Sequence, residues 1–279
     1  MQRHVGGSCR ESPWARRTGA ALLLIALTLA GSLSAQPTLK VHEETIHIKG
    51  PLAGLQLGLR HAYVTASTVA HRPVVLMLHG AGVPVSGNPD YPLGGRSMMT
   101  ALAENGLDVW ALDYYGFGDS DRYPEMQDAP QAHQPLGKAE DCADQVDSVM
   151  DFLKRDRKID TVMLMGDSGG SLVAGVYATR RPTLVSRLIL FGPETPFTAG
   201  EPAGSALPAY EDVTPADLWD QFTEWSHAAG KPDVLDASAF KEWAATYLRS
   251  DPTSATRTPP SVSIPNGRQV DTSAIAGCK

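Results

Sequence analysis

The stretch TVMLMGDSGG (residues 161–170) decides the fold class of this 279-residue chain. The run TVMLM predicts a strand buried on both faces, and the residues from Ser171 to Arg180 predict a helix. The turn between them must be tight, and glycine two positions away from Ser168 on either side avoids a collision of side chains. Such a turn lifts the Ser168 hydroxyl clear of the sheet, at a helix N-terminus that favours developing negative charge. Ser168 is therefore the candidate nucleophile, and its turn is formed by Gly166, Asp167, Gly169 and Gly170.

Two further turns follow predicted strands in the same way. The apolar run VVLML (74–78) leads into His79-Gly80-Ala81-Gly82, and the run at 109–112 leads into DYYGFGDS (113–120). A backbone amide of the first loop, together with that of Gly169, could hold an oxyanion. We expect His79 to be a structural hydrogen-bonding residue rather than a base. Each turn is a weak signal alone, but three of them in this order, each after a predicted buried strand, are much more specific.

The rest of the chain up to Pro193 alternates between strand and helix patterns. Strands are expected at 41–48, 55–65, 74–78, 109–112, 161–165 and 186–191, and helices at 96–105, 138–155 and 171–180. Such alternation predicts an α/β fold with a mostly parallel sheet flanked by helices.

The pattern changes after Pro193. Thr214-Pro215-Ala216-Asp217 is a typical helix start, and 239–249 is a second amphipathic segment. Residues 250–266 are rich in Pro, Ser and Thr and are predicted to be loop. We therefore expect 195–276 to form a helical insertion with long loops and no further sheet. Its aromatic residues could line an acyl pocket, although helical spacing more often reflects packing; they are Trp219, Phe222, Trp225, Trp243 and Tyr247.

With these turns in this order, the sequence resembles the α/β-hydrolase family. The resemblance covers roughly residues 41–193 together with a helical lid, and about six of the family's eight strands are present. It implies Ser168 as nucleophile and the amides of Ala81 and Gly169 as oxyanion hole, with no metal or organic cofactor. The segment 113–120 matches the family's DxxGxGxS loop, except that Tyr115 stands where Arg is usual.

Two other interpretations of the GDSGG turn fit worse. The run GDSGGSLVAGV (166–176) is similar to the nucleophile segment of trypsin-like proteases, which have Pro at the position of Ser171, several disulfides and an antiparallel double barrel. An Asp167 nucleophile, as in dehalogenases of the same fold, would require a small residue where Met165 stands. Ser168 has glycine at both required positions.

The family's triad also needs a His as general base and an acid, both carried after the lid. The last histidine here is His227, inside the expected lid, and the sequence stops at Lys279. We therefore expect a C-terminal truncation, with 277–279 beginning the missing part of the core and leaving an unpaired, aggregation-prone sheet edge. The His and acid are then expected beyond residue 279. Local substitutes are Glu194 as acid and His227 or His133 as base, although a structural role is expected for each His.

The first 35 residues have the layout of a secretory signal. A basic leader precedes the uncharged run AALLLIALTLA (20–30) and a small-residue site ending at Ala35. The alternative is a membrane anchor, but the run is short for a span. We therefore expect an exported protein, periplasmic or secreted, with a core at 36–194 and no membrane span after cleavage. In an oxidising compartment Cys142 and Cys278 could pair or stay unpaired.

Composition narrows the function classes. The chain is 42% hydrophobic and 20% charged, which excludes a disordered protein, and its formal charge of −7 with no dense basic patch disfavours nucleic acid. Two hypotheses follow. The complete protein is an exported, carboxylesterase-like serine hydrolase acting on a small-molecule acyl substrate. Alternatively, the chain is a catalytically incomplete fragment or a non-catalytic binding protein on a hydrolase scaffold.

Overall fold

The computed structural model describes residues 40–65, 72–193 and 207–267, all within one compact unit that spans Leu39–Lys279. The expected export signal, Glu194 and Cys278 lie outside the described residues. Within those three ranges, no helix is both long enough and apolar enough to cross a membrane.

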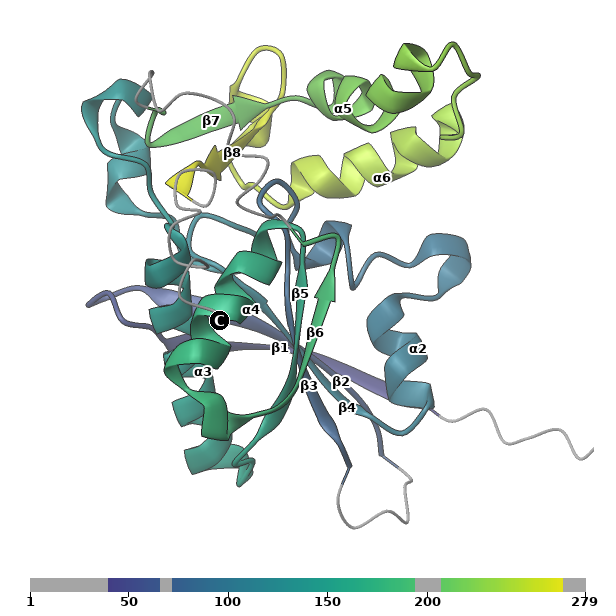
Figure 1. Cartoon of the computed structure of the whole chain (residues 1–279). Helices are drawn as coiled ribbons and strands as arrows, with labels where there is room; N and C mark the ends of the chain where they lie inside the picture. The colour runs from purple at the N-terminus through teal and green to yellow at the C-terminus, as the bar shows by residue number, and fades with distance from the viewer. Residues whose placement is uncertain (1–39, 66–71, 194–206, 268–279) are drawn as a thin grey trace, which may run out of the picture. The chain divides into compact units, whose positions relative to one another are not determined.

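Six strands form the main sheet, in the order β1-β2-β4-β3-β5-β6 (Figure 1). β1 and β2 form an antiparallel hairpin, β2 runs antiparallel to β4, and β4, β3, β5 and β6 are mutually parallel. The mostly parallel α/β sheet that the sequence predicts is therefore confirmed. The strand bounds are β1 Val41–Lys49, β2 Gln56–Val64, β3 Val74–Leu78, β4 Asp108–Asp113, β5 Val162–Asp167 and β6 Val185–Phe191.

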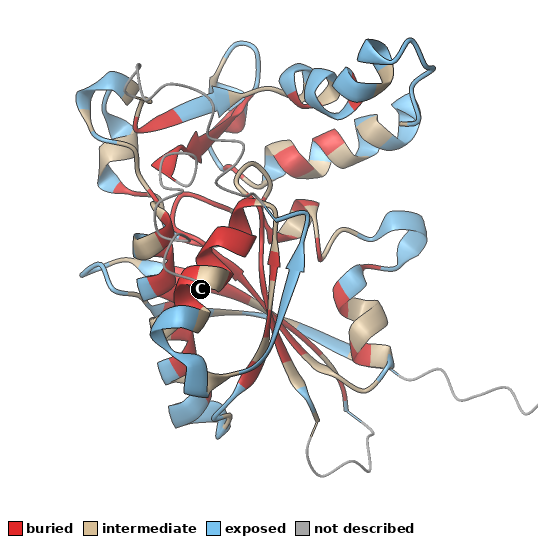
Figure 2. Ribbon diagram, viewed as in Figure 1, coloured by how far each residue is buried: buried red, intermediate tan, exposed pale blue. Residues whose placement is uncertain are grey.

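Helices cover both faces of this sheet because the buried strands are apolar on both sides. In β3, Leu76 and Leu78 belong to the larger core under α3 and α4, whereas Val75 and Met77 belong to a second core under α2. This alternation is the two-residue period of a strand. Figure 2 shows buried residues on the strands and on the inner sides of the helices. The helix bounds are α2 Met98–Glu104, α3 Ala139–Arg157 and α4 Gly169–Arg180.

Short 3-10 helices occupy the connections. They are η1 Val85–Gly87, η2 Leu93–Gly95, η3 Pro124–Gln127, η4 Pro130–Ala132, η5 Pro182–Leu184 and η7 Ser254–Thr256.

The described residues 207–267, called the lid below, contain two helices, α5 Pro215–Ala228 and α6 Ala237–Arg249. Thr214 is the N-cap of α5, as the sequence predicts, and Thr214 and Asp217 form a reciprocal capping box. The expectation that this region contains no further sheet is wrong. β7 (Tyr210–Val213) pairs antiparallel with β8 (Val262–Pro265). Each strand has four residues and β8 ends on a proline, so neither carries a recognisable alternating pattern.

The lid aromatics pack mainly on one another. The rings of Trp243 and Tyr247 stack at 5.4 Å, and Trp219 meets Phe240 edge-on at 5.1 Å. The Trp243 indole N–H donates to the Gly87 carbonyl across 2.7 Å, which fixes α6 against η1 of the core. Trp225 is different, because it is 82% exposed.

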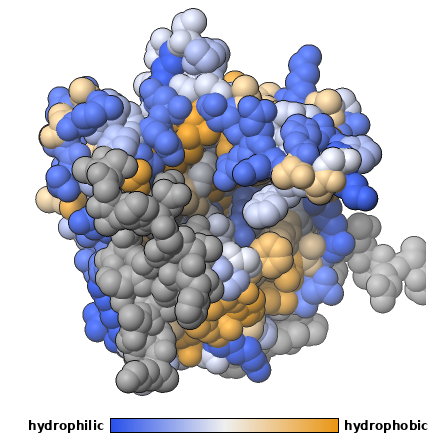
Figure 3. All heavy atoms as spheres, turned by 45° about the horizontal axis from the view of Figure 1, so that its top comes forward, coloured by the Kyte–Doolittle hydropathy of each residue, from blue (hydrophilic) through white to orange (hydrophobic). Residues whose placement is uncertain are grey.

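β6 forms one edge of the described sheet, and none of the described strands pairs with its outer side. Four consecutive apolar residues there are 40–67% exposed: Leu188, Ile189, Leu190 and Phe191. Figure 3 shows an extended apolar area on this face of the molecule. An exposed apolar edge strand is a template for pairing with another chain.

Candidate active site

The sheet order determines where the three turns meet. β3 lies between β4 and β5 in the sheet. The connection from β3 to β4 passes through α2 on one face of the sheet, and the connection from β4 to β5 passes through α3 on the other face. In open α/β sheets the crevice at such a switch point, beyond the carboxyl ends of the strands, is where ligands bind. Leu78 at the end of β3 is in register with Gly166 near the end of β5, so the loops that follow these strands lie side by side.

Ser168 lies at the sharp turn between β5 and α4. Its φ of 48° and ψ of −122° form a combination that a side chain rarely adopts, and such residues store roughly 1–3 kcal/mol of strain. The turn is held by its backbone. Ser168 N–H donates to the Phe191 carbonyl at 2.9 Å, and the Ser168 carbonyl accepts from Ser171 N–H at 2.8 Å. The Ser168 residue is half-buried.

The glycines on either side are required by the close approach of backbone. A Cβ on Gly166 would lie 2.5 Å from the Gly170 carbonyl oxygen. A Cβ on Gly170 would overlap the Leu78 carbonyl and lie 2.6 Å from that of His79. The first of these is the collision across the turn that the sequence predicts, and the second shows that α4 also presses against the end of β3.

The structure brings Ala81 and Gly169 together beside Ser168. A Cβ on Gly169 would lie 3.2 Å from both the nitrogen and the Cβ of Ala81. A Cβ on Gly80 would lie 3.4 Å from the Cβ of Ser168. The two amides that the family resemblance assigns to the oxyanion hole therefore belong to adjacent backbone segments.

Asn88 is a site residue that the sequence analysis missed. Its side-chain amide donates to Oδ2 of Asp167 at 2.5 Å. Both residues line a cavity of about 180 Å³, together with His79, Phe191 and three methionines, Met77, Met98 and Met165. No motif surrounds Asn88, so nothing in the sequence pointed to it.

The three candidate histidines all have partners. The His79 ring is buried and donates from Nδ1 to the Gly80 carbonyl at 2.7 Å, while Nε2 accepts from Tyr114 N–H at 3.3 Å. These two bonds use both nitrogens of a neutral imidazole, in line with the expected structural role. His133 pairs with Asp128 at 2.8 Å and His227 with Asp233 at 2.7 Å. Ser168 takes part in none of these contacts.

Asp113, the first residue of the third turn, joins two loops. Its carboxylate accepts from Val85 N–H at 2.8 Å and from Asp119 N–H at 3.1 Å. The side chain is 1% exposed, and burial raises the pKa of the Asp113 carboxyl to about 6. A Cβ on Gly118 would overlap this carboxylate, which explains the glycine there.

Among the described residues, no group of three or more His, Cys, Asp or Glu side chains is arranged to hold a metal ion. The Cys142 thiol is buried and donates to the Gly137 carbonyl at 3.5 Å.

The chain is similar to several solved structures at low sequence identity. It is similar to epoxide hydrolase VrEH1 from Vigna radiata, with 18% identity over 53% of this chain and 37% of that one and a TM-score of 0.39. It is also similar to a predicted CIB-like hydrolase from Thermoplasma acidophilum, with 17% identity over 57% of this chain and 67% of that one and a TM-score of 0.43. A third similar structure is the thioesterase domain from the curacin biosynthetic pathway, with 19% identity over 74% of this chain and 66% of that one and a TM-score of 0.48. The chain thus spans between about a third and two thirds of these structures.

Sequence comparison identifies the family. No curated protein matches the chain. Residues 70–214, just over half of the chain, match the family model Hydrolase_4, described as serine aminopeptidase, S33. This segment contains all three turns, and the chain therefore belongs to the S33 serine aminopeptidase family of α/β-hydrolases.

Proposed function

We propose that this protein is an exported serine hydrolase that cleaves an ester or a related acyl bond of a small molecule. The observation that carries the proposal is the conformation of Ser168. It stands at a strained strand-to-helix turn, with φ 48° and ψ −122°, beside the backbone of Ala81. Strain of this kind persists where the surrounding structure enforces it, and it is concentrated at functional sites.

The chemistry is acyl transfer through the Ser168 hydroxyl. Oγ attacks the acyl carbonyl carbon while a base takes its proton, and the amides of Ala81 and Gly169 donate to the resulting oxyanion. The carbon–oxygen bond to the leaving group then breaks, and the leaving group departs with the proton. Water attacks the acyl-enzyme in the same manner and regenerates Ser168. Each such oxyanion donor is worth about 3 kcal/mol of barrier.

We propose that the general base lies outside the described residues. The His79 ring bonds to the backbone of Gly80 and Tyr114. His133 pairs with Asp128, and His227 pairs with Asp233. This arrangement favours the second hypothesis for the described residues alone, namely a non-catalytic binding protein on the same scaffold.

The acyl group is proposed to be small and apolar. The cavity of about 180 Å³ that contains Asp167 is lined mainly by Met77, Met98, Met165 and Phe191. Methionine is a flexible apolar residue, and it suits a cavity that accepts short chains of differing shape.

Turnover of p-nitrophenyl acetate and butyrate tests the proposal. We expect the full chain to hydrolyse both esters and Ser168→Ala to lose the activity. Ser148→Ala is the matched control, because the Ser148 hydroxyl bonds only to the Asp144 carbonyl within α3. Hydrolysis that is equal in the full chain and in Ser168→Ala would contradict the proposal. Absence of turnover in every sample would support the binding-protein hypothesis instead.

Export is proposed from residues 1–35 alone. Intact mass of the protein recovered from the periplasm or medium should correspond to a chain beginning at Gln36. A mature protein that retains Met1 to Ala35 would contradict cleavage.

A further inference from the structure

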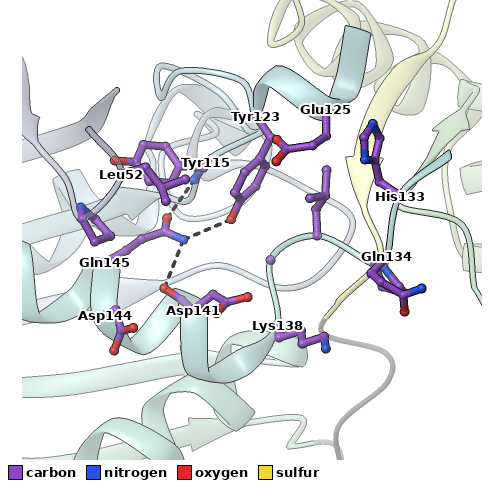
Figure 4. Close-up of a pocket in the computed structure, with 14 residues that line it drawn as sticks. Leu52, Tyr115, Tyr123, Glu125, His133, Gln134, Lys138, Asp141, Asp144 and Gln145 are labelled. Carbon is purple, nitrogen blue, oxygen red and sulfur yellow. Dashed lines mark hydrogen bonds between the residues drawn. The ribbon is translucent and has the colours of Figure 1, made fainter. Parts of the chain in front are cut away.

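A second cavity, of about 490 Å³, lies between the β1–β2 turn, the loop that contains Tyr123 and the N-terminal end of α3 (Figure 4). Its volume is in the range of small-molecule binding sites. Of its 14 lining residues, Tyr115 belongs to the third turn, at 113–120, and none belongs to the turns at 79–82 and 166–170 or to the smaller cavity beside Asp167. The function proposed above therefore does not account for it.

The charged groups that line this cavity are mainly acidic. Three carboxylates, those of Glu125, Asp141 and Asp144, face one lysine, Lys138. Asp144 already pairs with Arg180 at 3.1 Å. His133, which also lines the cavity, pairs with Asp128. The site therefore favours a cation over an anion.

Glu125 is the least satisfied of these groups. Its carboxylate makes no hydrogen bond or ion pair with any described residue, and its Oε2 is sealed from solvent. A carboxylate oxygen that has neither a donor nor water is unfavourable. Rotation about the last torsion of the side chain can turn either oxygen toward the cavity. A donor group of a ligand would relieve this cost.

The walls beside Glu125 are aromatic and fixed. The rings of Tyr115 and Tyr123 meet edge-on at 5.6 Å. Gln145 holds both residues, because its Oε1 accepts from Tyr115 N–H at 2.9 Å and its Nε2 donates to the Tyr123 hydroxyl at 3.3 Å. Figure 4 shows Tyr123 and Glu125 beside each other, with Asp141 and Gln145 on the helix opposite them. Aromatic faces near carboxylates suit an organic cation, whose apolar body packs on the rings.

We propose that this cavity binds a small organic primary ammonium ligand, with its N–H group donating to the Glu125 carboxylate and its apolar body against Tyr115 and Tyr123. A primary ammonium fits better than a quaternary one, because Glu125 lacks a hydrogen-bond donor and not only a positive charge.

Isothermal titration calorimetry of the full chain tests the site with three ligands of one shape. Benzylammonium carries the proposed charge, benzyl alcohol is neutral and benzoate is anionic. We expect measurable binding of benzylammonium at millimolar concentration, and much weaker binding of the other two. Equal binding of benzyl alcohol and benzylammonium would overturn the proposal, and so would absence of benzylammonium binding. Displacement of bound benzylammonium by sodium chloride at the same concentration as the ligand would also overturn it, because the site would then bind any cation.

The variant Glu125→Gln separates the site from a general effect of charge. It should lower the affinity for benzylammonium by about tenfold to a hundredfold, the loss expected for one charge-assisted hydrogen bond. Because Glu125 has no hydrogen-bond partner among the residues that the structure describes, this variant should unfold at the same temperature as the parent or a higher one. Glu224→Gln, an exposed glutamate of α5, is the matched control and should bind like the parent. Unchanged affinity in Glu125→Gln would overturn the proposal.

Discussion

The side-chain amide of Asn88 donates a hydrogen bond to Oδ2 of Asp167 across 2.5 Å. Asp167 immediately precedes Ser168, and Asn88 follows Gly87, whose carbonyl accepts the indole N–H of Trp243. The two-residue segment 87–88 therefore contacts both the lid helix α6 and the turn that presents Ser168. Asn88 is a positioning residue in this account, because it acts on Ser168 through its neighbour.

Replacing Asn88 with alanine should slow the reaction of Ser168 with a fluorophosphonate by about tenfold, the effect of losing one hydrogen bond of about 1.4 kcal/mol. The reason is that Asp167 would no longer be held against the loop that follows β3. The pseudo-first-order rate of labelling measures this effect. Asn105→Ala is the control, since its amide bonds to the Ala101 carbonyl at an exposed helix end. A rate for Asn88→Ala equal to that of the parent would show that the contact has no positioning role.

The glycines of α4 should respond very differently to a single methyl group. Gly170→Ala forces a Cβ onto the carbonyls of Leu78 and His79, and should cost about 3 kcal/mol or more. Gly175→Ala lies in the same helix with nothing within 4 Å of its Cβ, and should stabilise by up to about 1 kcal/mol. Chemical denaturation measures both changes in the free energy of unfolding. Similar effects of the two substitutions would mean that α4 does not press on the end of β3.

Asp113 should make stability depend on pH in a definite direction. Its folded pKa, about 6, is above the value of about 4 in an unfolded chain, so the native state binds the proton more tightly between these values. The contribution to the free energy of unfolding is therefore fully present below about pH 4 and is lost as the pH rises through about 6, a change of about 3 kcal/mol.

The variant Asp113→Asn isolates this effect. The difference between the free energies of unfolding of the parent and the variant should fall as the pH rises from about 4 to about 6. The asparagine also leaves one of the N–H groups of Val85 and Asp119 without an acceptor, which lowers the free energy of unfolding of the variant by a constant amount. The test therefore uses only the change of the difference with pH. Parallel curves over this interval would refute the assigned direction.

The exposed edge strand β6 should promote self-association. Leu188→Lys places a charge on this strand at a position that is 43% exposed, and charged edge strands resist pairing. Sedimentation velocity should show a smaller associated fraction than in the parent. Val234→Lys, at an apolar residue that is 93% exposed but outside the main sheet, should leave association unchanged. The idea fails if both variants associate as the parent does.

Local features were predictable from the sequence because neighbours in the chain determine them. The turn at Ser168 follows from a strand, two glycines and a helix within twenty residues, and the α5 start follows from the capping box of Thr214 and Asp217. The family resemblance joined the loop of Ala81 to that turn, and the structure places the two side by side.

Features made by distant segments were not predictable. β7 and β8 pair across about 50 residues, and each strand is too short to show alternation. Asn88 meets Asp167 only because β3 and β5 are neighbours in the sheet. The cavity around Glu125 is assembled from the β1–β2 turn, the loops that contain Tyr115 and Tyr123 and the start of α3, and no motif in the sequence joins these segments.

The most direct test of the central claim is the site of covalent modification by a fluorophosphonate, located by peptide mass spectrometry. The account predicts a single adduct on Ser168, absent from Ser168→Ala and retained in Ser148→Ala, and accelerated by free imidazole if the base lies outside the described residues. An adduct on another residue, or no adduct at Ser168 with and without imidazole, would contradict the assignment of Ser168 as the nucleophile.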